Sequence, residues 1–255
     1  MDSTDPVPPH PPSLRVATWN VHGAVGIDLR RSIDRVADVL RALEVDIALL
    51  QELDVGRSRS AREDQPSALA LRLGHTHVFG AAIEEGEASY GNAIVSRLPI
   101  TDASTHVLPA SPGAEPRAMT RGVIHGPLGS IELVVTHLGL LALDRLRQVE
   151  AILERLGPPT RPRIVGGDLN DGPTSRTLTR LLGDTLLRAE TRATFPAIAP
   201  FLRLDHVLVD RRLAVRRVAR PSLREIRAAS DHLPAIVEIT TRPERSESAR
   251  SSEVR

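Results

Sequence analysis

The stretch that decides the fold runs from residue 14 to residue 52 and reads LRVATWNVHGAVGIDLRRSIDRVADVLRALEVDIALLQE. Its two ends, LRVATWN (14–20) and DIALLQE (46–52), are short apolar runs of the kind that form buried strands. Between them, apolar residues recur at the spacing of one helix face, at Ile33, Val36, Ala37, Leu40 and Leu43. The stretch therefore predicts a strand, a helix and a second strand.

The rest of the chain continues this pattern. A second helix is predicted by Leu143, Leu146, Val149, Ile152, Leu153 and Leu156, with Gly157 in the position of a C-terminal cap. RPRIVGGDLN (161–170) follows as another buried strand. Further short apolar runs with few helical signals are HVFGAAI (77–83), YGNAIVSRLPI (90–100), AMTRGVIHG (118–126), SIELVVTHL (130–138), LDHVLV (204–209) and AIVEIT (235–240). Many short strands with few helices favour an α/β layered sandwich, with two packed sheets inside and helices outside.

Both ends of the chain hold little that could be buried. Residues 1–13 are rich in proline, and residues 242–255 are polar and charged. We therefore expect flexible tails around a single domain at 14–241. The start shows no leader pattern, and no run approaches the roughly 18 apolar residues of a membrane span. On this basis we expect a cytoplasmic protein, and we expect a monomer.

Composition excludes several kinds of chemistry. The absence of cysteine rules out disulfides, zinc–thiolate sites, iron–sulfur clusters and cysteine nucleophiles. The phosphate-binding P-loop, H-E-x-x-H, G-x-S-x-G and a strand-flanked G-x-G-x-x-G are also missing. All 33 basic residues are arginine and the net charge is +1, so the totals show no basic nucleic-acid surface, although a local groove could be positive. The carboxylate, Asn and His inventory suits a hard cation, Mg²⁺ or Mn²⁺.

Polar clusters at the ends of apolar strands indicate one site assembled from the whole chain. These clusters are TWNVHG (18–23), LQE (50–52), YGN (90–92), VTHL (135–138), GGDLN (166–170), RLDHV (203–207) and SDHLP (230–234). Glu52, after the apolar run IALLQ, is a candidate cation ligand, because a carboxylate entering the core edge is costly unless it is neutralised. The alternative is a strand end that emerges into solvent.

Two further pairs carry candidate chemistry. Asp168 and Asn170 are two residues apart, so in extended backbone their side chains share a face and could hold one water or phosphate. GGDLNDGP could equally be a plain turn. His232 with Asp205 could form a histidine–carboxylate pair for acid–base work, although a histidine near a chain end is more often a surface residue.

Taken in order, ATWNVHG, LLQE, YGNAIVSRLP, VVTHL, VGGDLN, RLDHVLV and SDHLP resemble the endonuclease/exonuclease/phosphatase superfamily, over about residues 14–240. The resemblance implies a four-layer α/β sandwich with two central mixed β-sheets flanked by helices. It also implies a metal-dependent phosphoester hydrolase that uses a Mg²⁺-activated water, with Mn²⁺ as a substitute ion.

The resemblance assigns expected roles residue by residue. Asn20, Glu52 and Asp231 would belong to the metal site, with Glu52 as a direct ligand. Asp168 and Asn170 would activate the attacking water and steady the phosphate. His232, oriented by Asp205, matches the terminal histidine, and His137 a histidine that contacts the phosphate or assists the leaving group. Asn92 and Arg117 are expected substrate-binding residues, and Arg97 is expected to form a structural salt bridge.

Departures from the family pattern narrow the range of substrates that we expect. His22 stands where apurinic endonucleases often carry an acidic residue, and the W-C-D-R block of inositol 5-phosphatases is absent. Aromatic residues are 2% of the chain, whereas single-stranded nucleic-acid channels use aromatic stacking platforms. No exposed apolar insertion for membrane docking is evident in the sequence. We expect a small-molecule or lipid-headgroup phosphoester, with a DNA or RNA nuclease as the alternative. A noncatalytic binding module is a third hypothesis, disfavoured because none of Glu52, Asp168, Asn170 and His232 is lost.

Overall fold

Two six-stranded sheets form the centre of the computed structural model, which describes residues 12–217 and 223–242. The first sheet has the order β11-β12-β1-β2-β4-β3, and the second β5-β6-β7-β8-β10-β9. Both are mixed, because β1 pairs parallel to β2 and β7 parallel to β8 while the other pairs are antiparallel. The strands of the first sheet are β1 (Ser13–Asn20), β2 (Ile47–Val55), β3 (Thr76–Glu85), β4 (Ala88–Ser96), β11 (Leu213–Arg217) and β12 (Ala235–Thr241). Those of the second are β5 (Ile100–Leu108), β6 (Arg117–Gly126), β7 (Gly129–His137), β8 (Arg163–Asp168), β9 (Leu186–Arg188) and β10 (Asp205–Asp210).

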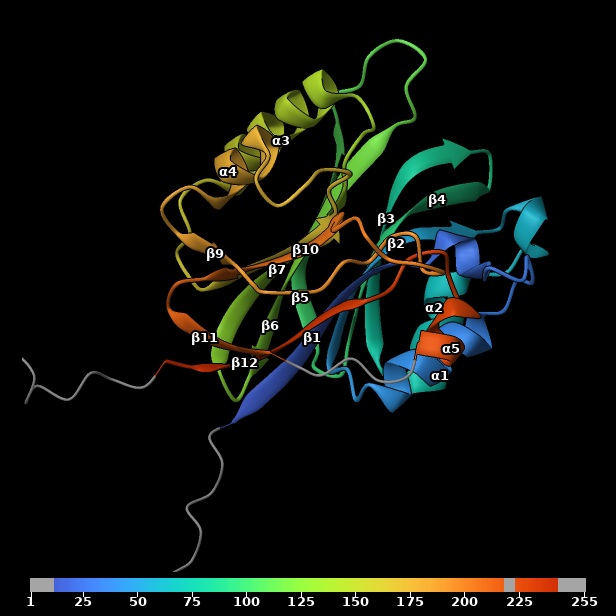
Figure 1. Cartoon of the computed structure of the whole chain (residues 1–255), viewed down its shortest axis with the longest axis horizontal. Coiled ribbons are helices and arrows are strands. Elements are labelled where there is room, and N and C mark those ends of the chain that lie inside the picture. The colour runs from blue at the N-terminus through green and yellow to red at the C-terminus, as the bar shows by residue number, and fades with distance from the viewer. Residues whose placement is uncertain (1–11, 218–222, 243–255) are drawn as a thin grey trace, which may run out of the picture.

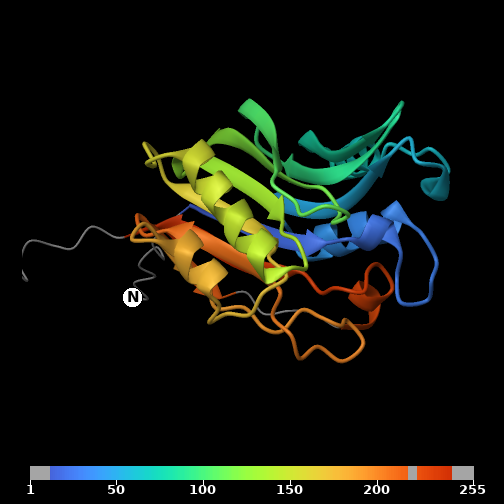
Figure 2. The ribbon, with the colours of Figure 1, turned by 90° about the horizontal axis from the view of Figure 1, so that it is seen from above.

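Helices cover the outer face of each sheet (Figure 1). The first sheet carries α1 (Ile33–Ala42), α2 (Gln65–Leu73) and α5 (Leu223–Arg227). The second carries α3 (Ala142–Leu156) and α4 (Arg176–Leu182), which lie beside each other in Figure 2. Short 3₁₀ turns, η1 (His22–Ala24) and η2 (Ser58–Ser60), follow β1 and β2. The predicted four-layer α/β sandwich is confirmed.

Three apolar layers hold the sheets and helices together, and they explain the near-continuous apolar runs of the strands. Side chains alternate along a strand, so Leu49 enters the core between the sheets and Leu50 the core under α1 and α2. In β7, Leu133 likewise faces the other sheet and Val134 faces α3. A strand buried on both faces reads as an unbroken apolar run.

The sheets approach closely near the middle of β8. A Cβ at Gly166 would lie 2.6 Å from Leu49 Cδ1 and 3.1 Å from the Cβ of Thr18, both in the facing sheet. Only glycine fits this position without displacing the neighbours. The close approach brings the ends of β1 and β8 together, where the polar clusters of the sequence lie.

The predicted domain begins and ends within one residue of β1 and β12. The expected tails, residues 1–13 and 242–255, lie almost wholly outside the described residues, so the domain boundaries stay a prediction. None of the helices in the described ranges is long and apolar enough to cross a membrane.

Candidate active site

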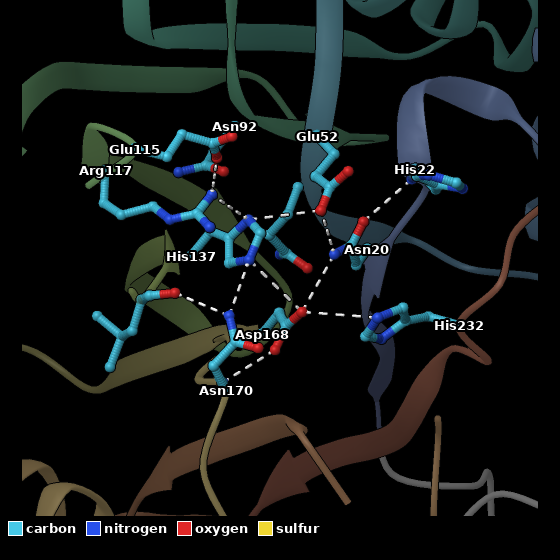
Figure 3. Close-up of polar contacts among 12 residues, drawn as sticks. Asn20, His22, Glu52, Asn92, Glu115, Arg117, His137, Asp168, Asn170 and His232 are labelled. Atoms are coloured by element: carbon cyan, nitrogen blue, oxygen red, sulfur yellow. Dashed lines mark hydrogen bonds and ion pairs between the residues drawn. The ribbon is translucent and has the colours of Figure 1, made fainter. Parts of the chain in front are cut away.

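Strands of both sheets bring polar side chains to one edge of the sandwich (Figure 3). Asn20 ends β1, whose parallel pairing with β2 sets it beside Glu52. In the second sheet, His137 at the end of β7 and Asp205 at the start of β10 both lie opposite Asp168 at the end of β8. A cleft of 410 Å³ opens at this edge, so residues far apart in the sequence line one space.

A β-bulge positions Glu52. The register of β2 against β4 shifts between Leu50 and Leu53, and Glu52 takes a left-handed backbone conformation with φ +63°. Its Oε1 accepts a hydrogen bond of 2.8 Å from Asn20 Nδ2, which also donates to Asp168 Oδ2 at 3.1 Å. Burial raises the pKa of Glu52, because an ionised carboxylate loses its hydration there; the bond from Asn20 opposes this effect.

Asp231 and His22 complete the same side of the cleft. The Nδ1 of His22 lies 3.6 Å from Asp231 Oδ1, and both side chains are partly exposed. The Oδ1 of Asn20 accepts a hydrogen bond from the backbone N–H of His22, which fixes the amide so that its nitrogen faces the carboxylates. Ser230 Oγ donates to the backbone carbonyl of Asn20 and so ties the Asp231 turn to β1.

Asp168 ends β8 and Asn170 lies in the bend that follows, and both line the cleft. Asp168 Oδ1 accepts a hydrogen bond from the backbone N–H of Asn170 at 2.9 Å. Asn170 has φ +49°, a left-handed conformation that Asn tolerates. Its Nδ2 donates to the carbonyl of Leu138 at 2.8 Å. Thus GGD closes β8 and the chain bends at Asn170, so the strand end and the bend together place the two polar groups.

His137 is a buried, neutral histidine in the floor of the cleft. Burial lowers the pKa of His137 to about 3; Asp168 opposes this shift, and the positive charge of Arg117 adds to it. An Arg117 N–H lies 3.1 Å from His137 Nδ1, and the amide nitrogen of Asn170 lies 3.1 Å from His137 Nε2. That nitrogen lies 3.6 Å from Asp168 Oδ2. Arg117 is itself held by an ion pair with Glu115.

His232 pairs with Asp205 at the opposite wall. His232 Nδ1 donates to Asp205 Oδ2 at 2.9 Å, and the Phe195 ring packs against the imidazole with 4.7 Å between ring centroids. Burial lowers the pKa of His232, but the charge and hydrogen bond of Asp205, together with Asp168 and Asp231, outweigh burial and raise it to about 9. The free Nε2 lies 3.7 Å from Asp168 Oδ2. The pair is therefore set to hold an imidazolium at neutral pH.

Two of the residues singled out in the sequence lie away from the cleft lining. Asn92 is buried, and its Nδ2 donates to the carbonyl of Ala118 at 2.9 Å, a bond that ties β4 to β6 across the two sheets. Asn92 therefore does not line the cleft, and its expected role in substrate binding stays a prediction. Arg97 forms an ion pair of 2.7 Å with Asp46, the structural salt bridge that the sequence predicted.

The cleft also has residues that sequence reasoning did not select. They are His22, Arg57, Arg59, Ile83, Tyr90, Glu115, Leu140 and Phe195. Arg59 donates twice to the buried Asp54, at 2.9 and 2.7 Å, and lies over the Tyr90 ring. The segment RSRS (57–60), which contains Arg57 and Arg59, shows neither a hydrophobic periodicity nor a recognisable motif. Two of them had a signal in the sequence: His22 departs from the family pattern, and Tyr90 belongs to the YGN cluster.

The carboxylates offer the best donors for a metal ion. Ligand atoms of Asp168, Asp205 and His232 all lie within 4.8 Å of one another. However, His232 Nδ1 and Asp205 Oδ2 are already joined by a hydrogen bond, which leaves neither atom free to bind a cation. The carboxylates of Glu52 and Asp231 line the cleft, and a hard divalent cation would offset the burial that raises the pKa of Glu52. The residues present therefore fit such an ion.

Two mixed sheets between helical layers, with carboxylates, histidines and an asparagine gathered at one edge, define a protein of the DNase I-like fold. Within that class, the chain belongs to the endonuclease/exonuclease/phosphatase family, whose sequence profile matches residues 17–232. This family hydrolyses phosphoesters and is generally dependent on divalent metals.

Individual relatives support the assignment. The chain is 30% identical over 250 residues to the uncharacterized protein YbhP of Escherichia coli K12, covering 89% of this chain and 96% of YbhP. A crystal structure of a family protein from Beutenbergia cavernae is similar with a TM-score of 0.70 and 25% identity, covering 90% of this chain and 72% of that one. Mannosyl-6-phosphatase Bt3783 of Bacteroides thetaiotaomicron shares the fold with a TM-score of 0.71 at 20% identity, covering 89% and 99%.

Proposed function

We propose that this protein is a divalent-metal-dependent phosphoric ester hydrolase that uses Mg²⁺, with Mn²⁺ as a substitute. The observation that carries the proposal is the convergence of Glu52, Asp168 and the Asp205–His232 pair on one cleft from both sheets. Structural packing alone does not require a buried carboxylate, a buried neutral histidine and a buried histidine of raised pKa at one place.

Glu52 and Asp231 are the proposed direct metal ligands. Asn20 presents its amide nitrogen to Glu52 and Asp168, so its proposed role is to hold the carboxylates in position rather than to bind through oxygen. When bound, a divalent cation stabilises the negative charge that develops on the phosphate oxygens.

The proposed hydrolysis adds a water oxygen to phosphorus, breaks the ester P–O bond and returns a proton to the departing oxygen. Asp168, held by the backbone of Asn170, is placed to orient the water and take its proton. Asn170 and neutral His137, whose side chains contact each other, are the proposed groups that steady the phosphate or assist the departing oxygen. Arg117 acts behind His137 and holds its ring in place.

His232 has two candidate roles, a base that must be neutral and a cationic clamp on the phosphate. We favour the clamp, because Asp168 is a base already available in the cleft and the His232–Asp205 bond stabilises the charged ring. Positioning and charge stabilisation supply most of the catalysis in phosphoryl transfer.

A screen of the purified chain tests the proposal. Generic mono- and diesters, abasic, single- and double-stranded DNA, RNA and phospholipid headgroups would be offered with Mg²⁺, with Mn²⁺ and with EDTA. We expect metal-dependent hydrolysis of at least one ester, abolished in Asp168→Asn and retained in Asp102→Asn, an exposed β5 residue that does not line the cleft. Equal rates in the wild type and in Asp168→Asn would refute the catalytic reading.

For the substrate, we propose a small-molecule or lipid-headgroup phosphoester ahead of a nucleic acid. The cleft contains three arginines, but Arg57, Arg59 and Arg117 are all paired with carboxylates of the chain. Little uncompensated positive charge is left to follow a nucleic-acid backbone. A nuclease remains the alternative that the screen separates.

A further inference from the structure

A second hollow of 380 Å³ adjoins the catalytic cleft. It lies between the loop that joins β5 to β6 and the start of α3, and Figure 1 shows this loop rising beside that helix. Glu115, Arg117 and Leu140 line both spaces. Because Arg117 contacts His137, the hollow opens directly beside the proposed phosphate position. A molecule whose phosphate occupies the cleft can therefore extend into it.

The deeper polar side chains of the hollow already form hydrogen bonds within the protein. The carboxylate of Asp144 accepts hydrogen bonds from the backbone N–H and the hydroxyl of Ser111, at 3.1 and 2.6 Å. The Gln148 amide accepts from the Gly139 N–H at 2.8 Å and donates to the Pro109 carbonyl at 3.0 Å. A ligand in the hollow would gain little from polar groups of its own, since these partners are already engaged.

Apart from Glu115 and Arg117, which pair with each other, the remaining side chains of the lining are apolar and open to solvent. Pro112, Ala114, Leu140 and Leu141 form this part, and Leu140 and Leu141 are 75% and 53% exposed. Neighbouring apolar side chains that stay exposed beside a cleft are typical of a surface that a ligand covers. Covering them with an apolar group would be favourable, whereas covering them with a charged group would not.

We propose that this hollow binds an aliphatic group esterified to the scissile phosphate, so that the preferred substrate is an amphiphilic phosphoester. The inference rests on the proposed function, which it deepens. The polar cleft binds the phosphate. The hollow between Ala114 and Leu141 shields the first methylene groups of the substrate's alkyl group from water. We name it the alkyl subsite, lined by Pro112, Ala114, Leu140 and Leu141.

Two substrate series test the alkyl subsite: alkyl p-nitrophenyl phosphodiesters and alkyl monophosphates, each from methyl to hexyl. For whichever series is hydrolysed, kcat/KM should rise about fourfold per methylene until the hollow is filled. Ala114→Trp, which obstructs the hollow, and Leu141→Asn, which makes its wall polar, should flatten that rise. The methyl ester is the reference within each variant, so only the dependence of kcat/KM on alkyl length is compared.

Matched controls are Ala103→Trp and Leu71→Asn, exposed positions on β5 and α2 that line neither space. Both should keep the wild-type dependence on chain length. Calorimetric titration with methyl- to hexylphosphonate in the presence of Mg²⁺ gives a readout without turnover, and affinity should follow the same trend.

The outcomes separate the two proposals. If no ester is hydrolysed in either series or in the wider screen, and no phosphonate binds, the proposed function fails. If esters are hydrolysed but kcat/KM and phosphonate affinity do not depend on chain length, the proposed function stands and the alkyl subsite is wrong. A rise in kcat/KM with alkyl length that persists in both Ala114→Trp and Leu141→Asn would also overturn the alkyl subsite, because the alkyl group would then bind elsewhere.

Discussion

The surroundings of Glu52 explain why this carboxylate is a candidate metal ligand. Glu52 could have been a strand end in solvent, but Asn20 and the β2 bulge hold it at the cleft. Its burial raises its pKa, so a nearby cation would stabilise the ionised form that the site needs. The position of the Glu52 carboxylate and the effect of burial on its pKa therefore both favour a bound cation.

Glu52→Gln tests the metal site. Removing one charge and one hard oxygen should weaken Mg²⁺ affinity and abolish activity while the fold is kept. Calorimetric titration with Mg²⁺ measures affinity, and circular dichroism checks the fold. Glu154→Gln, on α3 outside the cleft, is the matched control. Unchanged metal affinity and rate in Glu52→Gln would remove this residue from the site.

The pH–rate profile decides the role of His232. The pKa of His232 is raised to about 9, so the ring is charged below that pH and loses its charge as pH rises through it. A clamp predicts an alkaline limb near pH 9, which Asp205→Asn should move to lower pH because the neighbouring negative charge is lost. A base predicts the reverse, with the acid limb moving and the alkaline limb fixed.

Residue types at strand ends could be predicted from the sequence, but not every contact. Asp205 and His232, 27 positions apart, are hydrogen-bonded as the resemblance implied. By contrast, Asn92 and Arg59 show what sequence patterns miss. Asn92 lies on the same strand as Tyr90 but faces β6 instead of the cleft, and Arg59 enters the cleft because the buried Asp54 holds it. These directions depend on tertiary packing.

At the scale of elements, strands buried on both faces were the easiest to predict. β1, β2, β7 and β8 are continuous apolar runs, and Gly157 caps α3 as expected. β5 (ITDASTHVL) was missed because it is an edge strand with mostly exposed or half-exposed side chains and no apolar run. α2 was also missed, although Asp64 caps it and Pro66 occupies its first turn, signals that helices use at their start.

Gly166 provides a test of sheet packing. In Gly166→Val, the new side chain would overlap Leu49 and Thr18 of the facing sheet. Overpacking of this kind costs about 1–3 kcal/mol of unfolding free energy. Gly172→Ala, where an added Cβ meets nothing within 4 Å, is the control and should change little. Urea denaturation measures both, and equal midpoints would show that the sheets can separate at β8 without cost.

The whole molecule carries almost balanced charge, and this limits its partners. With a net charge of +1 and cleft arginines paired to carboxylates, no broad positive surface is expected to attract DNA. We predict no binding to a random duplex tighter than about 10⁻⁶ M at physiological salt. Fluorescence anisotropy across a salt series measures this. Submicromolar binding under those conditions would place the nuclease reading ahead of the small-molecule one.

The left-handed backbone at Glu52 implies a conflict between folding and activity. Non-glycine residues in that conformation cost about 1–2 kcal/mol, and here the cost falls on a half-buried side chain beside other carboxylates. Without metal, Glu52→Gly should therefore be more stable than the wild type by about 1 kcal/mol, while being inactive. Random mutation selected for thermal stability alone would then tend to erase the proposed metal ligand. A library screened for both properties would show whether residue 52 is kept only when hydrolysis is required.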